Sequence, residues 1–278
     1  YAAASVSHGT IFTGSVDGNI YALALGSPII PPADPNCPAS WLCQDIGAAN
    51  PAGSDSATGG TWTITSSGSG LGANGTDAVR LAAQTTTGDT QITAQLASTS
   101  ASMAGLMARQ SNDPGSPFYA IVATSATSVA VEYRTRFGGP ITTANQITLP
   151  AAPWLRLIRS GDTFRAATSP DGTTWTLIPG ATATLMLPAA VLTGMVVASG
   201  SASFASVTVG APGTIPLPPA SPSPCPTNWT CQDIGDPLLT GDQSLSGGVW
   251  TIKGAGSDIN GYSCLLYTSD AADDLTRV

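Results

Sequence analysis

Charged and helix-forming side chains are scarce in this sequence. Asp, Glu, Lys and Arg make up only 9% of its 278 residues, and Glu132 and Lys253 are its single Glu and its single Lys. The chain is rich instead in Gly and Pro, with 31 and 22 residues, and in Ser, Thr and β-branched residues. Such a composition disfavours helices and indicates an all-β protein.

Histidine is nearly absent, and basic residues do not outnumber acidic ones. The one histidine is His8, so the central region, 37–210, can form neither a Ser-His-Asp or Cys-His catalytic group nor a His-rich zinc site. That region holds eight acidic residues and seven arginines, a balance of −1, within a net charge of −8 for the whole chain. Without a basic excess, we expect no nucleic-acid partner.

Long hydrophobic runs are also missing. The most continuous apolar stretch extends from Leu185 to Gly200 and contains Pro188 and Gly194. It is shorter than the roughly 20 residues that a helix needs to cross a bilayer. We therefore expect a buried strand here and no membrane span, and nothing in the sequence indicates an oligomer.

What the sequence does contain is a long internal repeat. The stretch from Cys37 to Ile64 recurs after an offset of 188 residues, which places Cys37 on Cys225, and the second copy continues to about residue 263. An offset of that size indicates a repeated domain and not a solenoid unit, whose period is about 20 to 50 residues. Pro-rich segments at 26–36 and 211–224 precede the two copies and are typical of stiff linkers.

These boundaries predict six segments. We expect a hairpin at 1–25, a linker at 26–36, a complete β-sandwich at 37–210, a second linker at 211–224 and the start of a second sandwich at 225–263. The remaining residues, 264–278, depart from the repeat and resemble translated sequencing-adapter read-through, as in metagenomic gene fragments, so they are excluded from the fold prediction. The alternative is a genuine acidic tail.

Four of the five cysteines belong to the repeat. Cys37 and Cys43 recur as Cys225 and Cys231, which favours one small disulfide loop in each copy and an oxidising, extracytoplasmic compartment. A pair of reduced cysteines and a metal site are the alternatives. If the disulfides form, the Cα atoms of each pair must lie within about 7 Å of each other.

Short apolar runs separated by Gly, Asn, Asp and Pro follow one another between the linkers. With no helical periodicity, they predict an antiparallel sandwich. The predicted strands are 61–66, 78–83, 90–96, 104–109, 119–124, 128–135, 154–160, 163–169, 175–178, 192–199 and 202–209. Two further strands, 10–14 and 19–25, flank an Asp-Gly turn near the N-terminus, which predicts a hairpin.

Two parts of the sequence resemble known families. The hairpin motif TIFTGSVDGNIYAL resembles one blade of a PQQ-like β-propeller. The motifs GGTWTI, AGLMAR, EYRTR, PWLRLIRSGDTF, SPDGTTW and ASFASVTV resemble a concanavalin A-like or laminin-G-like domain over residues 41–209, of the lectin-like "regulation of enolase" type found in secreted bacterial multidomain proteins. This resemblance implies a jelly-roll β-sandwich and a role in carbohydrate binding or adhesion.

The arginines are the strongest candidates for a binding site. If their strands are neighbours in one sheet, six side chains form a platform suited to sugar hydroxyls, carboxylates or an acidic protein surface: Arg109, Glu132, Arg134, Arg136, Trp154 and Arg156. The alternative is an ordinary solvated sheet face with Trp154 in the core. Trp62 is expected in the core, because strand alternation turns it inward and the repeat keeps it. Trp175, which follows the hairpin turn, is expected in or near the core as well.

Catalysis and metal binding are less favoured. Retaining glycosidases need two carboxyl groups about 5 Å apart, and Glu132 has no acidic residue two or three positions away. We expect Glu132 to pair with a neighbouring arginine. Asp77 follows a Gly-rich loop and is a candidate calcium ligand, but one carboxylate is fewer than calcium requires, so no cofactor is expected.

The sequence thus predicts a non-catalytic module of a secreted or surface-attached bacterial protein. Its expected partners are glycans or a surface protein. The alternatives are a structural spacer and an accessory domain of an upstream propeller enzyme.

Overall fold

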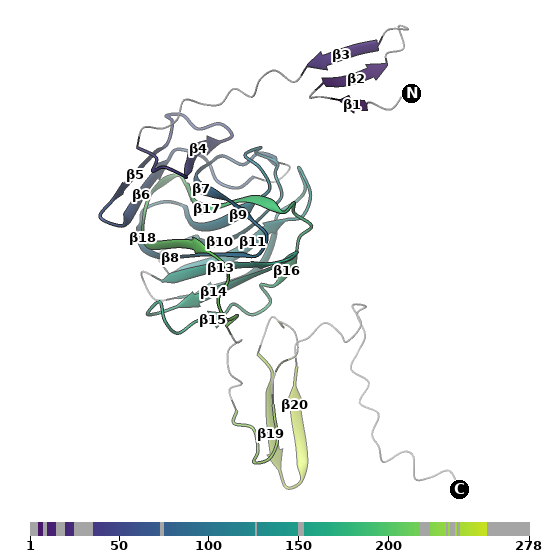
Figure 1. Ribbon diagram of the computed structural model, residues 1–278. Coiled ribbons are helices and arrows are strands. Elements are labelled where there is room, and N and C mark those ends of the chain that lie inside the picture. Colours follow the sequence, from purple (N-terminus) through teal and green to yellow (C-terminus); the bar gives the residue numbers. More distant parts are fainter. Residues whose placement is uncertain are drawn as a thin grey trace. The chain divides into compact units, whose positions relative to one another are not determined.

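Within the residues that it describes, the long regular elements of this computed structural model are β-strands (Figure 1). The structure describes residues 5–7, 10–14, 20–24, 36–72, 75–125, 127–149, 153–216, 223–231, 233, 237 and 240–254. Two compact units divide the chain, Tyr1–Pro35 and Asn36–Val278, and each is described by itself. Within these residues no helix has the length and apolar character that a membrane crossing needs.

The first unit contains one antiparallel sheet with the strand order β1-β2-β3. Its strands are β1 (Ser5–Ser7), β2 (Thr10–Gly14) and β3 (Ile20–Ala24). The predicted pair of strands is confirmed as β2 and β3, while the turn between them lies outside the described residues. The likeness to a propeller blade stays a prediction.

The second unit is an antiparallel jelly-roll β-sandwich, which confirms the predicted fold class. One sheet has seven strands in the order β12-β11-β10-β9-β17-β7-β4. These strands are β4 (Leu42–Ile46), β7 (Val79–Thr87), β9 (Met103–Arg109), β10 (Phe118–Ala123), β11 (Ser128–Arg134), β12 (Thr142–Thr148) and β17 (Ala190–Ala198).

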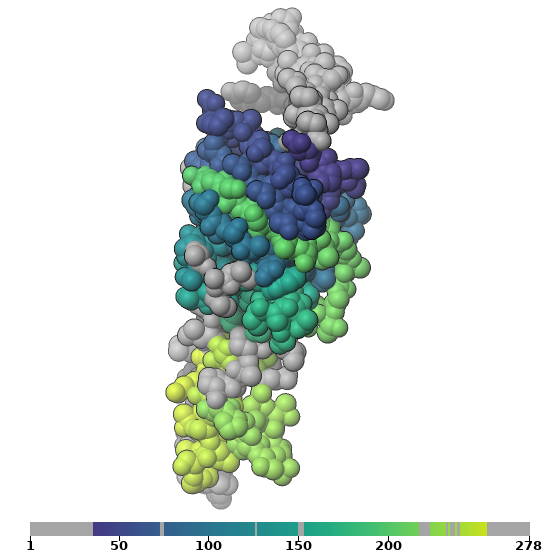
Figure 2. Space-filling model, turned by 90° about the vertical axis from the view of Figure 1, so that its left-hand side faces the viewer, coloured from purple at the N-terminus to yellow at the C-terminus, as the bar shows by residue number. Residues whose placement is uncertain are grey.

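The other sheet has the order β15-β14-β13-β8-β18-β6-β5, and β16 pairs with β14 beside that path. Its strands are β5 (Ser54–Thr58), β6 (Thr61–Ser66), β8 (Thr90–Thr99), β13 (Trp154–Ser160), β14 (Thr163–Ser169), β15 (Thr176–Leu177), β16 (Ala183–Thr184) and β18 (Gly200–Gly210). Because β6 pairs with β18, the first and last parts of the sandwich lie side by side, as blue and green atoms in Figure 2.

The main core lies between the two sheets. Alternation along the strands turns one set of side chains inward, including Leu106, Ile121, Leu157 and Phe204. The hydroxyl of Tyr119 is buried there and donates a hydrogen bond of 2.6 Å to the carbonyl of Ala181. Satisfied in this way, a buried tyrosine stabilises the core instead of weakening it.

A second apolar cluster covers the other face of the seven-stranded sheet. It contains Leu81, Met107, Phe118 and Val196, all fully buried. This sheet is therefore apolar on both faces, unlike a sheet that has one face in water. Loops at one end of the sheet contribute Leu71 and Ile141 to the cluster.

Residues 223–254 contain a two-stranded sheet of β19 (Asp242–Ser246) and β20 (Val249–Lys253). Its local geometry matches that of the first repeat copy. The predicted disulfides are present in both copies, with Cα distances of 5.7 and 5.6 Å. Trp229 and Trp250 pack with ring centroids 4.9 Å apart, and the equivalent pair Trp41 and Trp62 lies at 4.7 Å.

Candidate functional site

Three loops meet at one end of the seven-stranded sheet. They are the loop that leads into β7, the β9–β10 loop (110–117) and the β11–β12 loop (135–141). A β-carbon added to Gly75 would lie 2.8 Å from the Cα of Gly115 and 3.2 Å from that of Gly138, and Gly75 has a φ of +78°. Only glycine allows so close an approach of three backbones in this conformation. We call this meeting point the loop rim.

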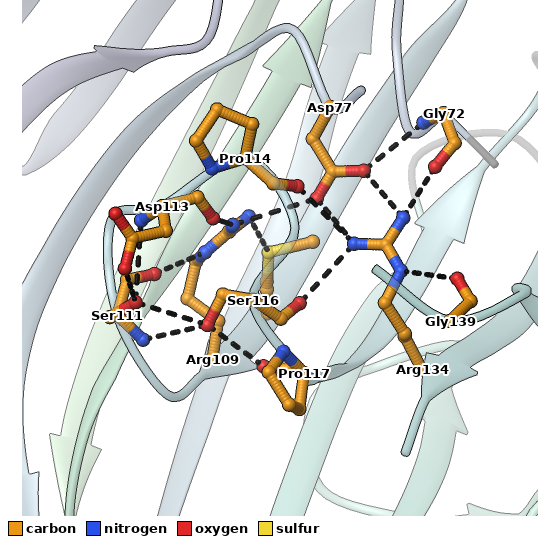
Figure 3. Close-up of polar contacts among 11 residues, drawn as sticks. Gly72, Asp77, Arg109, Ser111, Asp113, Pro114, Ser116, Pro117, Arg134 and Gly139 are labelled. Carbon is orange, nitrogen blue, oxygen red and sulfur yellow. Dashed lines mark hydrogen bonds and ion pairs between the residues drawn. The ribbon is translucent and has the colours of Figure 1, made fainter. Parts of the chain in front are cut away.

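A buried ionic cluster holds the rim together (Figure 3). The Asp77 carboxylate lies between two fully buried guanidinium groups. Its oxygens are 2.8 and 2.9 Å from Nη2 and Nη1 of Arg134 and 3.5 Å from Nη2 of Arg109. The backbone N–H of Gly72 donates a further hydrogen bond of 3.1 Å to Asp77. One carboxylate therefore links strands β9 and β11 to the loop before β7.

The two arginines in turn donate to backbone carbonyl groups of all three loops. Arg134 donates to the carbonyls of Gly72, Pro114, Ser116 and Gly139. Arg109 donates to those of Ser111 and Asp113, each at 2.6 Å. Because carbonyl groups in loops have no ladder partner, these bonds satisfy them and fix the loop conformations.

Burying the charges of this cluster costs free energy, and their mutual attraction offsets part of that cost. Burial lowers the pKa of Arg109 to about 10, although the Asp77 carboxylate acts in the opposite direction. Two guanidinium groups share one buried carboxylate, so their positive charges repel each other while Asp77 attracts both. Buried charges of this kind are stable only when they are paired and hydrogen-bonded, as they are here.

An aromatic ring stands exposed on this fixed rim. Phe137 is 68% exposed, and its ring lies against the backbone of Gly115, where an added β-carbon would be 3.0 Å from Cε1 of the ring. The backbone N–H of Gly138 donates 2.9 Å to the carbonyl of Gly115 and joins the two loops. Arg136, also exposed, runs along Gly139 of the same loop.

The predicted platform of six residues on one face is wrong. Arg109, Glu132 and Arg134 belong to the seven-stranded sheet, whereas Trp154 and Arg156 belong to the other sheet. Arg109 and Arg134 are fully buried, so they support the loops and do not reach a surface ligand. The alternation within each strand was predicted correctly, but it could not tell which strands share a sheet.

Glu132 does not form the expected ion pair with a described arginine. It lies half-buried opposite Ala120 and Thr143 on the face of the sheet that carries the second apolar cluster. Burial raises the pKa of its carboxyl group. An isolated carboxyl group of this kind does not make the pair of acids that glycoside hydrolysis uses.

Calcium binding by Asp77 is also contradicted, because the oxygens that would face the ion accept hydrogen bonds from Arg109 and Arg134. In the described part of the chain, no cluster of three or more His, Cys, Asp or Glu side chains is suited to a metal ion.

Trp154 and Arg156 lie on the outer face of the eight-stranded sheet, and neither is in the core. Trp175 joins them, with its ring centroid 3.8 Å from Cζ of Arg156. It is half-exposed, and so less buried than expected, whereas Trp62 is in the core as expected, with 7% exposure.

Sequence reasoning missed Phe137 altogether. The available signal was an aromatic residue followed by Gly-Gly-Pro directly after a strand, which places a bulky ring in a turn.

Comparison with known proteins found matches among solved structures and none by sequence. No family model and no curated protein matches the sequence. A functionally unknown protein from Saccharomyces cerevisiae is 18% identical, with 63% of this chain and 98% of that chain covered and a TM-score of 0.48. The carbohydrate binding module CBM66 from Bacillus subtilis is 16% identical, with coverages of 62% and 96% and a TM-score of 0.44.

The exoplasmic/lumenal domain of VIP36, solved in a Ca2+/Man3GlcNAc-bound form, is 11% identical, with coverages of 63% and 85% and a TM-score of 0.41. Each of these TM-scores is below 0.5. We therefore base the function on the geometry of the sites alone.

Proposed function

We propose that the sandwich is a non-catalytic carbohydrate-binding module of an extracellular or cell-surface protein, and that the loop rim holds the sugar. The observation that carries this proposal is the exposed ring of Phe137 on loops that a buried ionic cluster fixes in place. Because the loops hold the ring in one orientation, its exposed face is presented to solvent in a fixed position, and an aromatic face suits the C–H face of a sugar ring.

Loops that are ordered before binding raise the affinity for ligands whose individual contacts are weak, such as sugars. A loop that is already ordered loses little conformational entropy when the ligand arrives, so more of the contact energy appears as affinity. Arg136 is exposed on the same loop as Phe137 and offers a fork of N–H donors to sugar hydroxyls. The binding loops thus combine a stacking surface, hydrogen-bond donors and rigidity.

The disulfides support the proposed location. Both cysteine pairs are joined, and disulfides persist in oxidising compartments outside the cytoplasm. Glu132 and the fully paired Asp77 do not supply the two free carboxyl groups of a glycosidase, which favours binding over hydrolysis.

We also propose that residues 225–263 begin a second sandwich of the same kind, and that residues 1–25 end a propeller. In support, the N–H of Gly53 donates 3.0 Å to Asp45 in the first copy, and that of Gly241 donates 3.1 Å to Asp233 in the second. Two linked modules would raise the avidity of weak binding without new contacts.

A glycan screen on the full chain tests the main proposal. We expect binding to a subset of glycans, and Phe137→Ala should weaken it at least about tenfold, since one buried aromatic contact is worth about 1.5–3 kcal/mol. Val249→Ala is the matched control, because Val249 is 67% exposed, nearly the same as Phe137, and lies on β20, outside the sandwich. Binding that Phe137→Ala leaves unchanged, or no binding at millimolar glycan, would overturn the proposal.

A further inference from the structure

A second surface combines aromatic rings with unpaired positive charge. It lies on the outer face of the eight-stranded sheet, around β13, β14 and the turn that leads to β15 (Figure 1). Four half-exposed side chains form it, and we call it the sheet patch: Trp154, Arg156, Arg165 and Trp175. None of them belongs to the loop rim.

Arg156 is held in a fixed orientation at the centre of the patch. Its guanidinium stacks on the Trp175 ring, with Cζ 3.8 Å from the ring centroid. Its Nε donates a hydrogen bond of 3.2 Å to Oγ1 of Thr93 on the neighbouring strand. Stacking covers one face of the guanidinium and Nε is used, so the edge formed by Nη1 and Nη2 remains for a ligand. This edge has the geometry that binds a carboxylate through two parallel hydrogen bonds.

The turn after β14 positions both indoles. An added β-carbon on Gly172 would lie 2.8 Å from Cε2 of Trp154, and the φ of Gly172 is +75°. The carbonyl of Gly172 accepts a hydrogen bond of 3.1 Å from Nε1 of Trp175. Glycine is thus required here both for its backbone conformation and for space, and it places a ring on either side of the turn.

No described carboxylate neutralises the patch. Arg165 lies diagonally across from Arg156, because it pairs with Ile158 in the antiparallel register, and diagonal neighbours are about 7–8 Å apart. Neither arginine forms an ion pair within the described residues. The nearby Asp171 directs its carboxylate into its own turn, where the N–H groups of Thr173 and Thr174 donate to it at 2.7 and 2.8 Å.

Hydroxyl groups extend the same sheet face away from the patch. Thr65 donates a hydrogen bond of 3.1 Å to Ser201, and the hydroxyls of Thr63 and Ser203 lie 3.4 Å apart. In the strand order β14, β13, β8, β18, β6 these hydroxyls lie on the second and third strands from β13, about 10 to 14 Å across the sheet at the usual spacing between strands. This uncharged hydroxyl strip, together with the aromatic and cationic patch, suits an extended ligand that has both hydroxyl and carboxylate groups.

We propose that the sheet patch is a second binding site, specific for acidic polysaccharide built from uronic acids. The carboxylate of one sugar pairs with the free edge of Arg156, and Arg165 adds long-range attraction. The indoles contact the sugar rings, and the hydroxyl strip receives the continuing chain. An acidic peptide would supply the carboxylates but not the rigid rings with hydroxyls that the rest of the surface matches.

The test compares two polymers that differ in charge alone. Binding of the full chain to polygalacturonate and to its fully methyl-esterified form is measured by titrating each polymer into the protein. The buffer contains EDTA, and the titration is repeated at low and at high salt. We expect the acid form to bind at least about tenfold more tightly, because hydrogen bonds to charged groups are the stronger ones. The difference should shrink as salt rises.

Variants locate the site. Arg156→Lys keeps the charge but loses the fork and the stacking, and we expect it to lower the affinity for polygalacturonate about tenfold, while Arg165→Ala mainly reduces the salt dependence. The control is Lys253→Ala, an exposed cation of β20 that belongs to neither binding surface, which should leave the affinity for this polymer unchanged.

Three outcomes would overturn this inference. They are equal binding of the esterified and acid polymers, equal binding of polyglutamate and polygalacturonate, and polygalacturonate binding that responds to Arg136→Ala but not to Arg156→Lys. In each case sugar binding at the rim can still stand, because that proposal depends on Phe137. Conversely, loss of rim binding in Phe137→Ala leaves the sheet patch intact.

Discussion

Asp77 shows how much structure one side chain can organise. Its carboxylate is buried between two guanidinium groups, and those groups donate hydrogen bonds to six loop carbonyls. No apolar residue could replace it without leaving Arg109 and Arg134 buried and uncompensated. The residue therefore acts through the loops, and through them on the exposed ring of Phe137.

Replacement of this carboxylate should be severely destabilising. We expect Asp77→Asn to lower the free energy of unfolding by about 3–5 kcal/mol, because it leaves two buried guanidinium groups without a counter-charge. Chemical denaturation measures the change. Asp162→Asn is the control, since that carboxylate is exposed in the turn between β13 and β14, outside the rim, and should change stability by no more than about 0.5 kcal/mol. Equal, small effects of the two substitutions would contradict the structural role of the cluster.

At the scale of elements, the seven-stranded sheet depends on two glycines inside its central strands. A β-carbon on Gly105 of β9 would lie 2.0 Å from the carbonyl oxygen of Ile121, and one on Gly194 of β17 would lie 2.0 Å from that of Ala82. The neighbouring strands thus approach closely at points where any side chain would push them apart. Glycine inside a strand commonly marks such a close approach.

This close approach predicts a sharp difference between two glycines. Gly105→Ala should destabilise by at least about 1–3 kcal/mol, because the backbone must shift to accept the methyl group, and lower Tm by roughly 2–4 °C per kcal/mol in a domain of this size. Thermal unfolding measures it. Gly210→Ala is the matched control, since nothing lies within 4 Å of an added β-carbon there. A Gly105→Ala protein that melts like Gly210→Ala would show that the sheet adapts freely.

The four strands of the sandwich that sequence reasoning missed share a physical cause. β4 and β12 are the edges of one sheet, β5 is an edge of the other, and β16 pairs beside the edge strand β15. Edge strands are short and polar because they face water and must resist pairing with other chains. They lack the apolar alternation that identified the buried strands, so β12, with the sequence TTANQIT, resembled a loop.

At the scale of the whole molecule, the two repeat copies have the same local structure but different surroundings. Ile64 on β6 is fully buried, whereas its equivalent Ile252 on β20 is 74% exposed. Trp229 is likewise 62% exposed, while its equivalent Trp41 packs against the core. The inward residues are kept in both copies, although the described part of the second copy offers them no core.

A charged side chain in β20 should destabilise the protein only where a core covers it. If residues 225–263 begin a second sandwich, that core forms when the remaining strands of the sandwich are present. Ile64→Asp should unfold the first sandwich, because it buries an unpaired carboxylate, and Ile252→Asp should be neutral within about 0.5 kcal/mol. In a chain extended after Gly254 by a second copy of residues 67–210, we expect Ile252→Asp to become strongly destabilising for the added unit. Tryptophan fluorescence and denaturation monitor both units, and a neutral Ile252→Asp in the extended chain would argue against the second sandwich.

The sequence by itself determined the all-β class, the disulfide pairs and most inward-facing positions. These depend on composition and on the period-two alternation of strands, which are local properties. Tertiary structure decided which strands share a sheet, because strand pairing joins residues far apart in the chain. It brought Asp77, Arg109 and Arg134 into one buried cluster and placed Arg156 against Trp175 on the opposite sheet. The predicted single platform thus became two separate surfaces.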